Sequence, residues 1–260
     1  MMLENKIAVV YGAGGHIGGA VAKALAADGA KVFLTGRTLD KVEKVAAEIG
    51  AAGGVAEAAQ VDALNNEAIE QHLTDVVKKA GRIDISFNAI SIRGDLQGTP
   101  LHKMKYDDFI TPISVGSSAH FLTATAAARH MIEAHSGVIL TLSSSAPGLS
   151  GRDRMFHKPG GFGVACAAIE EFSRTLAGEL GPLGVRVVCL RSDAVSEVWP
   201  IEHEKEWAPA KAYMDASTVL GRLPKLAEIA GAAVFAASDR ASAMTGTLLN
   251  LTCGSIMDAN

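Results

Sequence analysis

The sequence predicts an α/β fold, in which one domain holds a doubly wound, seven-stranded parallel sheet with helices on both faces. Short β-rich runs alternate with helical patterns along the whole chain, which is typical of right-handed βαβ units. Strand candidates such as IAVV, VILTL and VRVVCL are continuously apolar, as expected for strands covered by helices on both sides. No linker or low-complexity tract divides the chain, so we expect a single domain over residues 1–260.

The individual elements follow from hydrophobic periodicity and from the turn residues between the periodic segments. Strands are expected at Lys6–Tyr11, Lys31–Thr35, Gly54–Val61, Ile83–Asn88, Val138–Ser143, Val185–Leu190 and Thr247–Leu251. Helices are expected at Ile17–Asp28, Asp40–Ile49, Asn66–Ala80, Phe121–Ala134, Phe162–Leu180 and Lys225–Ala237. The helix from Phe162 is the clearest, because apolar residues recur along it at three- and four-residue spacing.

Composition narrows the class of protein. The chain is 48% hydrophobic and 20% charged, with a formal net charge of −4 and no basic cluster, so a nucleic-acid partner is not expected. No targeting segment precedes the first strand, and no apolar run approaches the length of a membrane span. Three widely spaced cysteines, Cys166, Cys189 and Cys253, predict neither a disulfide framework nor a metal site. We therefore expect a reduced, cytoplasmic protein without a membrane or metal partner.

One segment interrupts the alternation of strands and helices. Residues 193–217 lie between the sixth strand and the last helix and contain both tryptophans. An insertion of this length is either a lid or a partly ordered surface loop. We favour a substrate-covering role, because ligands of open α/β sheets bind beyond the carboxyl ends of the strands.

A glycine cluster follows the first strand in YGAGGHIGGAVAKAL, Tyr11 to Leu25. Glycines let the backbone turn tightly and approach a pyrophosphate, and the following helix N-terminus offers free N–H groups to an anion. Glycines also serve tight turns that bind nothing, but the position between a strand and a helix favours a dinucleotide site.

Over essentially its full length the chain resembles the short-chain dehydrogenase/reductase family, which implies a Rossmann-type fold and a homotetramer or homodimer. The family motif T-G-x-x-x-G-x-G falls on Tyr11 to Gly18, with His16 where the middle glycine is expected. In the family, residues at the position of Asp62 contact adenine, and residues at the position of Asn88 pin the central sheet. The resemblance implies a cofactor site formed by Gly12, Gly14, Gly15, His16, Ile17, Gly18, Arg37, Asp62 and Asn88.

The end of the second strand, LTGRT, bears on the choice of cofactor. A carboxylate there would accept hydrogen bonds from the ribose 2′-OH of NAD(H), but Gly36 offers none and Arg37 follows it. A guanidinium can pair with a 2′-phosphate and stack on adenine. NADP(H) is therefore preferred over NAD(H), with His16 and Thr38 as auxiliary contacts. The alternative is that Arg37 is only a solvated loop residue.

Catalysis in the family uses an Asn, a Ser, and a Tyr and Lys four residues apart. Ser144, in VILTLSSSA, falls on the serine. Phe162 falls on the tyrosine, Cys166 on the lysine and Gly116 on the asparagine. Phe162 has no proton to give, and a thiol does not make the three hydrogen bonds of an ammonium.

Three other residues are candidates for the missing chemistry. His157, followed by Lys158, stands at the family's usual Ser-to-Tyr spacing and is either a substitute proton donor or a solvated loop residue. Asp193, after the sixth strand, is either an acid/base group or, as we favour, a turn residue that caps its own backbone. Cys166 is either a nucleophile at a helix N-terminus or, as we favour, a packing residue.

Two functions remain open from the sequence. The first is an NADP(H)-dependent oxidoreductase with a non-standard active site, acting on a small carbonyl, alcohol or enone. The second is a catalytically inactive family member that acts as a nucleotide-binding sensor or a scaffold.

Overall fold

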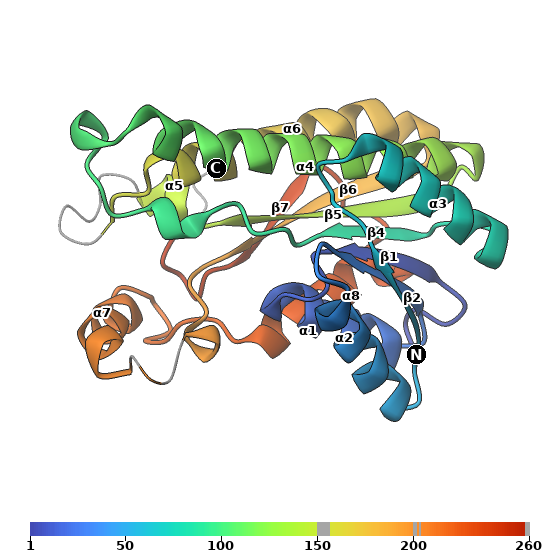
Figure 1. Cartoon of the computed structure of the whole chain (residues 1–260), viewed down its shortest axis with the longest axis horizontal. Helices are drawn as coiled ribbons and strands as arrows, with labels where there is room; N and C mark the ends of the chain where they lie inside the picture. The colour runs from blue at the N-terminus through green and yellow to red at the C-terminus, as the bar shows by residue number, and fades with distance from the viewer. Residues whose placement is uncertain (150–156, 200–201, 203, 258–260) are drawn as a thin grey trace.

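A computed structural model of the protein describes residues 1–149, 157–199, 202 and 204–257. Its strands form one parallel sheet in the order β3-β2-β1-β4-β5-β6-β7 (Figure 1). The strands are β1 Ile7–Tyr11, β2 Lys31–Gly36, β3 Val55–Gln60, β4 Ile85–Asn88, β5 Gly137–Ser144, β6 Val185–Ser192 and β7 Thr247–Leu251. The predicted fold class is confirmed, and the sheet order reverses between β1 and β4, where such sheets bind ligands.

Helices cover both faces of the sheet (Figure 1). They are α1 His16–Ala27, α2 Leu39–Ala51, α3 Asn66–Ala80, α4 Tyr106–Glu133, α5 Ala146–Leu149, α6 Gly160–Leu180, α7 Glu204–Ala216 and α8 Leu226–Ala237. One apolar cluster fills the space between the sheet and α1 and α8, and a second fills the space beneath α3, α4 and α6. Among the described residues, no helix combines the length and apolarity that crossing a bilayer requires.

The helix predicted at Phe121–Ala134 begins much earlier, at Tyr106, so its predicted start is wrong. Pro112 inside this helix made the TPIS stretch look irregular, since proline removes a helical hydrogen bond and crowds the preceding turn. Pro112 is buried, and α4 packs along α6, which is the tertiary context that outweighs local propensity here.

Helices α5 and α7 were not predicted, and α7 occupies much of the segment 193–217. In Figure 1, α7 projects from the body of the molecule on the side where the β-strands end. Strands β5 and β6 both extend past their predicted ends, and their last residues, Ser144 and Ser192, pair in register. This register places Ser144 at the carboxyl edge of the sheet.

Candidate active site

The glycine loop between β1 and α1 is held tightly against its surroundings. Gly12 has φ +77°, and a Cβ at this residue would lie 2.8 Å from the carbonyl oxygen of Ala89. A Cβ on Gly18 would collide with the carbonyl oxygen of Gly12. The N–H of Gly15 donates to the same Gly12 oxygen at 3.0 Å. Both family glycines that the sequence retains are therefore sterically required.

His16 stands where the family has its middle glycine, and it is the first residue of α1. Its side chain is exposed, so the substitution leaves the packing of the helix intact. Ile17 is partly buried and packs against the core under α1. Gly15 is the N-cap of the helix and lacks a side chain that could bond the first free N–H groups.

A cavity of about 420 Å³ lies at the switch point of the sheet. The glycine loop forms one wall through Gly12, Gly14 and Gly15. The ends of the neighbouring strands contribute Arg37 and Asp62. The geometry thus brings most of the predicted cofactor residues to one hollow.

Arg37 and Asp62 are anchored through their own turns. The side chain of Gln60 donates to the carbonyl oxygen of Arg37 at 2.9 Å, which fixes the backbone after β2. The carboxylate of Asp62 accepts the N–H of Leu64 at 3.0 Å. The guanidinium of Arg37 makes no ion pair or hydrogen bond within the described part of the chain, so it is available to a ligand.

The side chain of Asn88 binds helix α4 instead of lining the cavity. Its amide donates to the carbonyl oxygen of Ala119 at 3.0 Å and to the hydroxyl of Thr123 at 2.9 Å, both on α4. Its own oxygen accepts the N–H of Ile90. The side chain therefore ties the end of β4 to α4, while the residues that follow it, Ala89 to Ser91, line the cavity.

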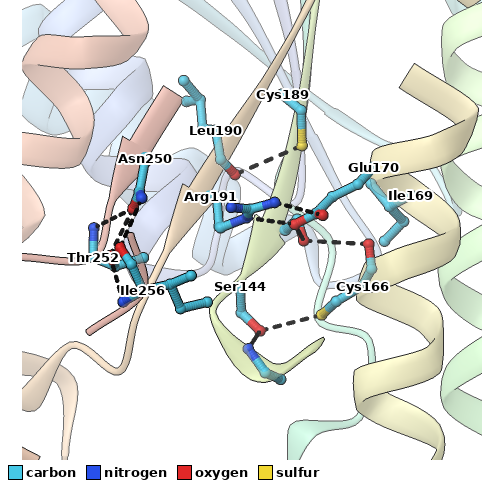
Figure 2. A network of polar contacts seen from close by, with 12 residues as sticks. Ser144, Cys166, Ile169, Glu170, Cys189, Leu190, Arg191, Asn250, Thr252 and Ile256 are labelled. Atoms are coloured by element: carbon cyan, nitrogen blue, oxygen red, sulfur yellow. Dashed lines mark hydrogen bonds and ion pairs between the residues drawn. The ribbon is translucent and has the colours of Figure 1, made fainter. Parts of the chain in front are cut away.

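Ser144 and Cys166, the serine and lysine positions of the family, lie side by side (Figure 2). Their Oγ and Sγ atoms are 3.2 Å apart, and either can be the donor. Ser144 Oγ also accepts the N–H of Ala146. Cys166 is buried, and burial raises the pKa of its thiol, so this pair is uncharged at neutral pH.

Phe162 lies in the first turn of α6, at the tyrosine position. It is partly buried against a small apolar cluster that includes Cys166. Its ring edge also lies against the short 3₁₀ segment Gly94–Leu96, where a Cβ on Gly94 would be 3.4 Å from Phe162 Cε2. The ring therefore packs as a hydrocarbon between α6 and the loop after β4.

Gly116, at the asparagine position, is a packing residue. A Cβ there would lie 3.3 Å from Ile92 Cγ2 and 3.5 Å from Ala165 Cβ. Its carbonyl oxygen accepts a hydrogen bond from Nδ1 of the buried His120. A larger side chain at this position would have to displace the apolar cluster under Phe162.

A buried ion pair near Ser144 was not anticipated from the sequence (Figure 2). Arg191, on β6, donates to both carboxylate oxygens of Glu170, on α6, at 2.7 and 2.8 Å. Ser143 Oγ donates to the same carboxylate at 2.9 Å. The only signal was an arginine and a glutamate inside otherwise apolar segments, where unpaired charges are costly.

Asp193 is a turn residue, as favoured from the sequence. One carboxylate oxygen accepts the N–H of Ala194 at 2.7 Å, and the other accepts the hydroxyl of Ser255. The carboxylate is thus shared between its own turn and the turn that follows β7. No observation here gives it an acid/base role.

His157 and Lys158 lie just before α6 and are partly buried. The carbonyl oxygen of Lys158 accepts the N–H of Gly98 at 2.9 Å, which joins this segment to the loop after β4. Residues 150–156 lie outside the described part of the chain. The proton-donor role of His157 stays a prediction.

In the segment 193–217, Trp199 and Trp207 contact each other, with ring centroids 5.7 Å apart. Trp207 is on α7 and remains about half exposed. The pair connects the start of the segment with its helix. A substrate-covering role for this segment likewise stays a prediction.

A doubly wound sheet with a glycine loop at its switch point defines a dinucleotide-binding protein. Residues 12–255 match the family model described as "Enoyl-(Acyl carrier protein) reductase". The chain therefore belongs to the short-chain dehydrogenase/reductase family of NAD(P)-dependent oxidoreductases.

Individual relatives match over nearly their whole length. A 3-oxoacyl-[acyl-carrier-protein] reductase from Synechocystis is 32% identical, with 98% of each chain covered. D-threitol dehydrogenase from Mycolicibacterium smegmatis is 28% identical, with 97% of this chain and 93% of the relative covered. The solved structure of NAD⁺-bound xylitol dehydrogenase has a TM-score of 0.85 and 26% identity, and the match covers 98% of this chain and 100% of that one.

Proposed function

We propose that the protein is an NADP(H)-dependent oxidoreductase with a non-standard active site. The observation that carries the proposal is the cavity at the switch point, which combines the sterically required Gly12 and Gly18 loop with the unpaired guanidinium of Arg37. The narrow glycine loop suits a pyrophosphate, and the guanidinium suits a 2′-phosphate. When bound, the cofactor would supply or accept the hydride.

For the chemical step, Ser144 is the residue we assign to the substrate. Its hydroxyl, at the carboxyl edge of β5, can donate to a substrate oxygen when the thiol of Cys166 is the donor in their mutual hydrogen bond. Phe162 and the buried Cys166 add apolar surface and no charge. We propose a small carbonyl, alcohol or enone as substrate. A polarised double bond needs positioning for hydride transfer, and solvent or His157 would then provide the proton.

The second candidate function is a nucleotide-binding sensor or scaffold without catalysis. The contact between Ser144 and Cys166 favours it, because the one retained catalytic side chain is engaged with the residue that replaced its neighbour. Phe162 packs as a hydrocarbon in the same region. In this case nucleotide binding would persist while turnover is absent.

Calorimetric titration with NADPH, NADP⁺, NADH and NAD⁺, repeated on Arg37→Ala, tests the nucleotide part. We expect tight NADP(H) binding that is weakened selectively in the variant. Saturable NADPH oxidation with a panel of small carbonyls and enones then separates the two candidates. Activity supports the oxidoreductase, binding without activity supports the sensor, and binding of none of the four nucleotides would overturn both.

We further propose that the protein is one domain that assembles as a homodimer or homotetramer in the cytoplasm. Phe121, on α4, is half exposed and contacts Phe172 on α6, with ring centroids 6.3 Å apart, which gives the α4/α6 surface an apolar character. The three cysteines are free thiols, in keeping with a reducing compartment. Sedimentation of the purified protein would test the assembly.

A further inference from the structure

Ser144 and Cys166 share one hydrogen bond, but together they carry two protons (Figure 2). Their Oγ and Sγ atoms are 3.2 Å apart, and either atom can be the donor. Only one of the two protons can lie between these atoms, so the other proton must point elsewhere. Its direction decides whether the hydroxyl of Ser144 can donate to a ligand.

The two groups differ in their access to water. Cys166 is 0% exposed, whereas Ser144 is partly exposed at the carboxyl edge of β5. If Ser144 donated, the thiol proton would need another acceptor inside the fold. The hydroxyl of Ser143 also lies beside this thiol, but it already donates to the carboxylate of Glu170 and to the carbonyl oxygen of Cys166. If Cys166 donates instead, its buried S–H is paired and the partly exposed O–H can reach solvent or a ligand.

The acceptor positions of Ser144 favour the same direction. A hydroxyl oxygen offers two acceptor positions, and sulfur is the weaker acceptor of the two atoms. One position on Ser144 Oγ accepts the N–H of Ala146 at 3.2 Å, and the thiol proton would fill the second. Burial raises the pKa of the Cys166 thiol, so this proton is retained at neutral pH. The O–H of Ser144 would then point away from both Ala146 and Cys166.

We propose that Cys166 is a positioning residue, whose S–H donates to Ser144 Oγ and thereby directs the Ser144 O–H to the substrate oxygen. The thiol would orient the serine through a neutral contact, from the position where the family has its lysine. The backbone of Cys166 is held in place for this role, because its carbonyl oxygen accepts a hydrogen bond from Ser143 Oγ at 3.3 Å. This inference rests on the proposed oxidoreductase function, in which Ser144 contacts the substrate.

Infrared absorption of the S–H stretch tests the direction of the hydrogen bond without any need for turnover. This band falls in a region free of other protein absorptions, and a thiol that donates a hydrogen bond absorbs at lower wavenumber than a free thiol. The difference between the wild type and Cys166→Ala isolates the Cys166 band from those of Cys189 and Cys253. We expect the Cys166 band at low wavenumber in the wild type and at higher wavenumber in Ser144→Ala.

Two further variants control for the neighbouring hydroxyls. Ser145 is buried on the same stretch of chain, and within the described residues it makes no hydrogen bond to Cys166, so Ser145→Ala should leave the band unchanged. Ser143→Ala removes the other hydroxyl beside the thiol and should also leave the band at low wavenumber. Circular dichroism of each variant establishes that it is folded.

NADPH oxidation with the panel of carbonyls and enones tests the consequence for Ser144. Cys166→Ala should lower kcat about 3- to 10-fold, the effect of losing one modest hydrogen bond, while KM for NADPH is unchanged. Cys166→Ser keeps a donor at this position and should restore most of the rate. An apolar packing role for Cys166 predicts the opposite order, with alanine tolerated better than serine.

Three results would overturn the inference. A Cys166 band at the position of a free thiol, or a band that responds to Ser143→Ala and not to Ser144→Ala, would mean that Cys166 does not donate to Ser144. Equal rates in the wild type and Cys166→Ala would remove the positioning role while leaving the oxidoreductase function standing. If the wild type reduces no member of the panel, the oxidoreductase function fails and the positioning role fails with it, whatever the direction of the hydrogen bond.

Discussion

The two ends of the site differ in how their polar groups are used. At the nucleotide end, Arg37 and Lys41 line a cavity and have no partner among the described residues, although Arg93 in the same cavity pairs with Asp95. At the chemical end, polar groups satisfy one another: Ser144 contacts Cys166, and Glu170 binds Arg191. Exposed cations without a partner are free to bind an anionic ligand, whereas mutually paired buried groups are already satisfied within the fold. The nucleotide end therefore carries the stronger functional argument.

Restoring the family's tyrosine and lysine should have the largest effect, and it tests whether the chemical end can support catalysis. The double variant Phe162→Tyr with Cys166→Lys should raise NADPH-dependent ketone reduction by about 10²–10⁴-fold, because it supplies a positioned general acid. The side chain at 166 already points to Ser144, 3.2 Å from its hydroxyl. The rate of NADPH absorbance loss measures the gain.

Phe172→Tyr, on the same helix but beside Phe121, is the control and should leave the rate unchanged. If the double variant binds NADPH and still gains nothing, the chemical end is blocked by more than these two substitutions. The scaffold interpretation would then be favoured.

Disrupting the buried ion pair should have the next largest effect, which is on the free energy of unfolding. Glu170→Gln leaves the guanidinium of Arg191 buried without its carboxylate, and we expect the free energy of unfolding to fall by about 3–5 kcal/mol. The side chains of Glu170 and Arg191 are only 8% and 11% exposed, so solvent gives little compensation. Denaturant unfolding, followed by circular dichroism, measures the loss.

Glu171→Gln is the matched control, since Glu171 pairs with Arg174 on the surface of the same helix. It should cost less than about 1 kcal/mol. Replacing Glu170 and Arg191 together by Met and Leu should recover most of the lost stability, because a buried pair can be exchanged for apolar residues. A double variant as unstable as Glu170→Gln would contradict this account.

Sequence patterns predicted the parts of the fold that depend on local periodicity. The seven strands and the glycine loop were recognisable because continuous apolar runs and glycines between a strand and a helix have few alternative explanations. The beginning of α4 was missed because Pro112 disfavours a helix locally, and only packing against α6 overrides it.

The chemical end could be predicted only in part. The resemblance to the family placed Ser144, Phe162 and Cys166 at the catalytic positions, but the contact between Ser144 and Cys166 depends on how β5 and α6 pack. The ion pair of Glu170 with Arg191 joins residues from different elements, and no local pattern relates them. Such pairings become visible only when the tertiary structure is known.

Substitution of a loop glycine should have a smaller effect, and it tests whether the glycine loop at the nucleotide end is sterically constrained. Gly18→Ala places a methyl group against the carbonyl oxygen of Gly12, so it should lower the unfolding free energy by about 1–3 kcal/mol and weaken nucleotide binding. Gly231→Ala, inside α8 with no atom near its Cβ, should instead stabilise the protein by about 0.5–1 kcal/mol. Equal effects of the two substitutions would show that Gly18 is not sterically constrained.

The smallest effect concerns alkaline pH and the chemical end alone. Burial raises the pKa of Cys166 and raises the pKa of Cys189 to about 12. Cys189 therefore stays protonated in the folded protein above pH 8.5, while the unfolded chain releases this proton, and the shift of Cys166 acts in the same direction. A thiol whose pKa is higher in the folded protein than in the unfolded chain contributes its full stability below the unfolded-state pKa. This contribution is lost as the pH rises toward the folded-state pKa.

Unfolding free energy should therefore fall between pH 8.5 and 10 by about 1 kcal/mol per pH unit for Cys189, with a further decrease in the same direction from Cys166. Cys189→Ala should reduce this slope, whereas Cys253→Ala, at a partly exposed site, should change it less. Hydrogen exchange localises the effect: protection should decrease first around β6 and α6, where the two buried thiols lie, and last at the glycine loop. Uniform loss of protection would mean that the nucleotide end and the chemical end unfold as one unit. The two ends would then differ in their polar contacts but not in their local stability.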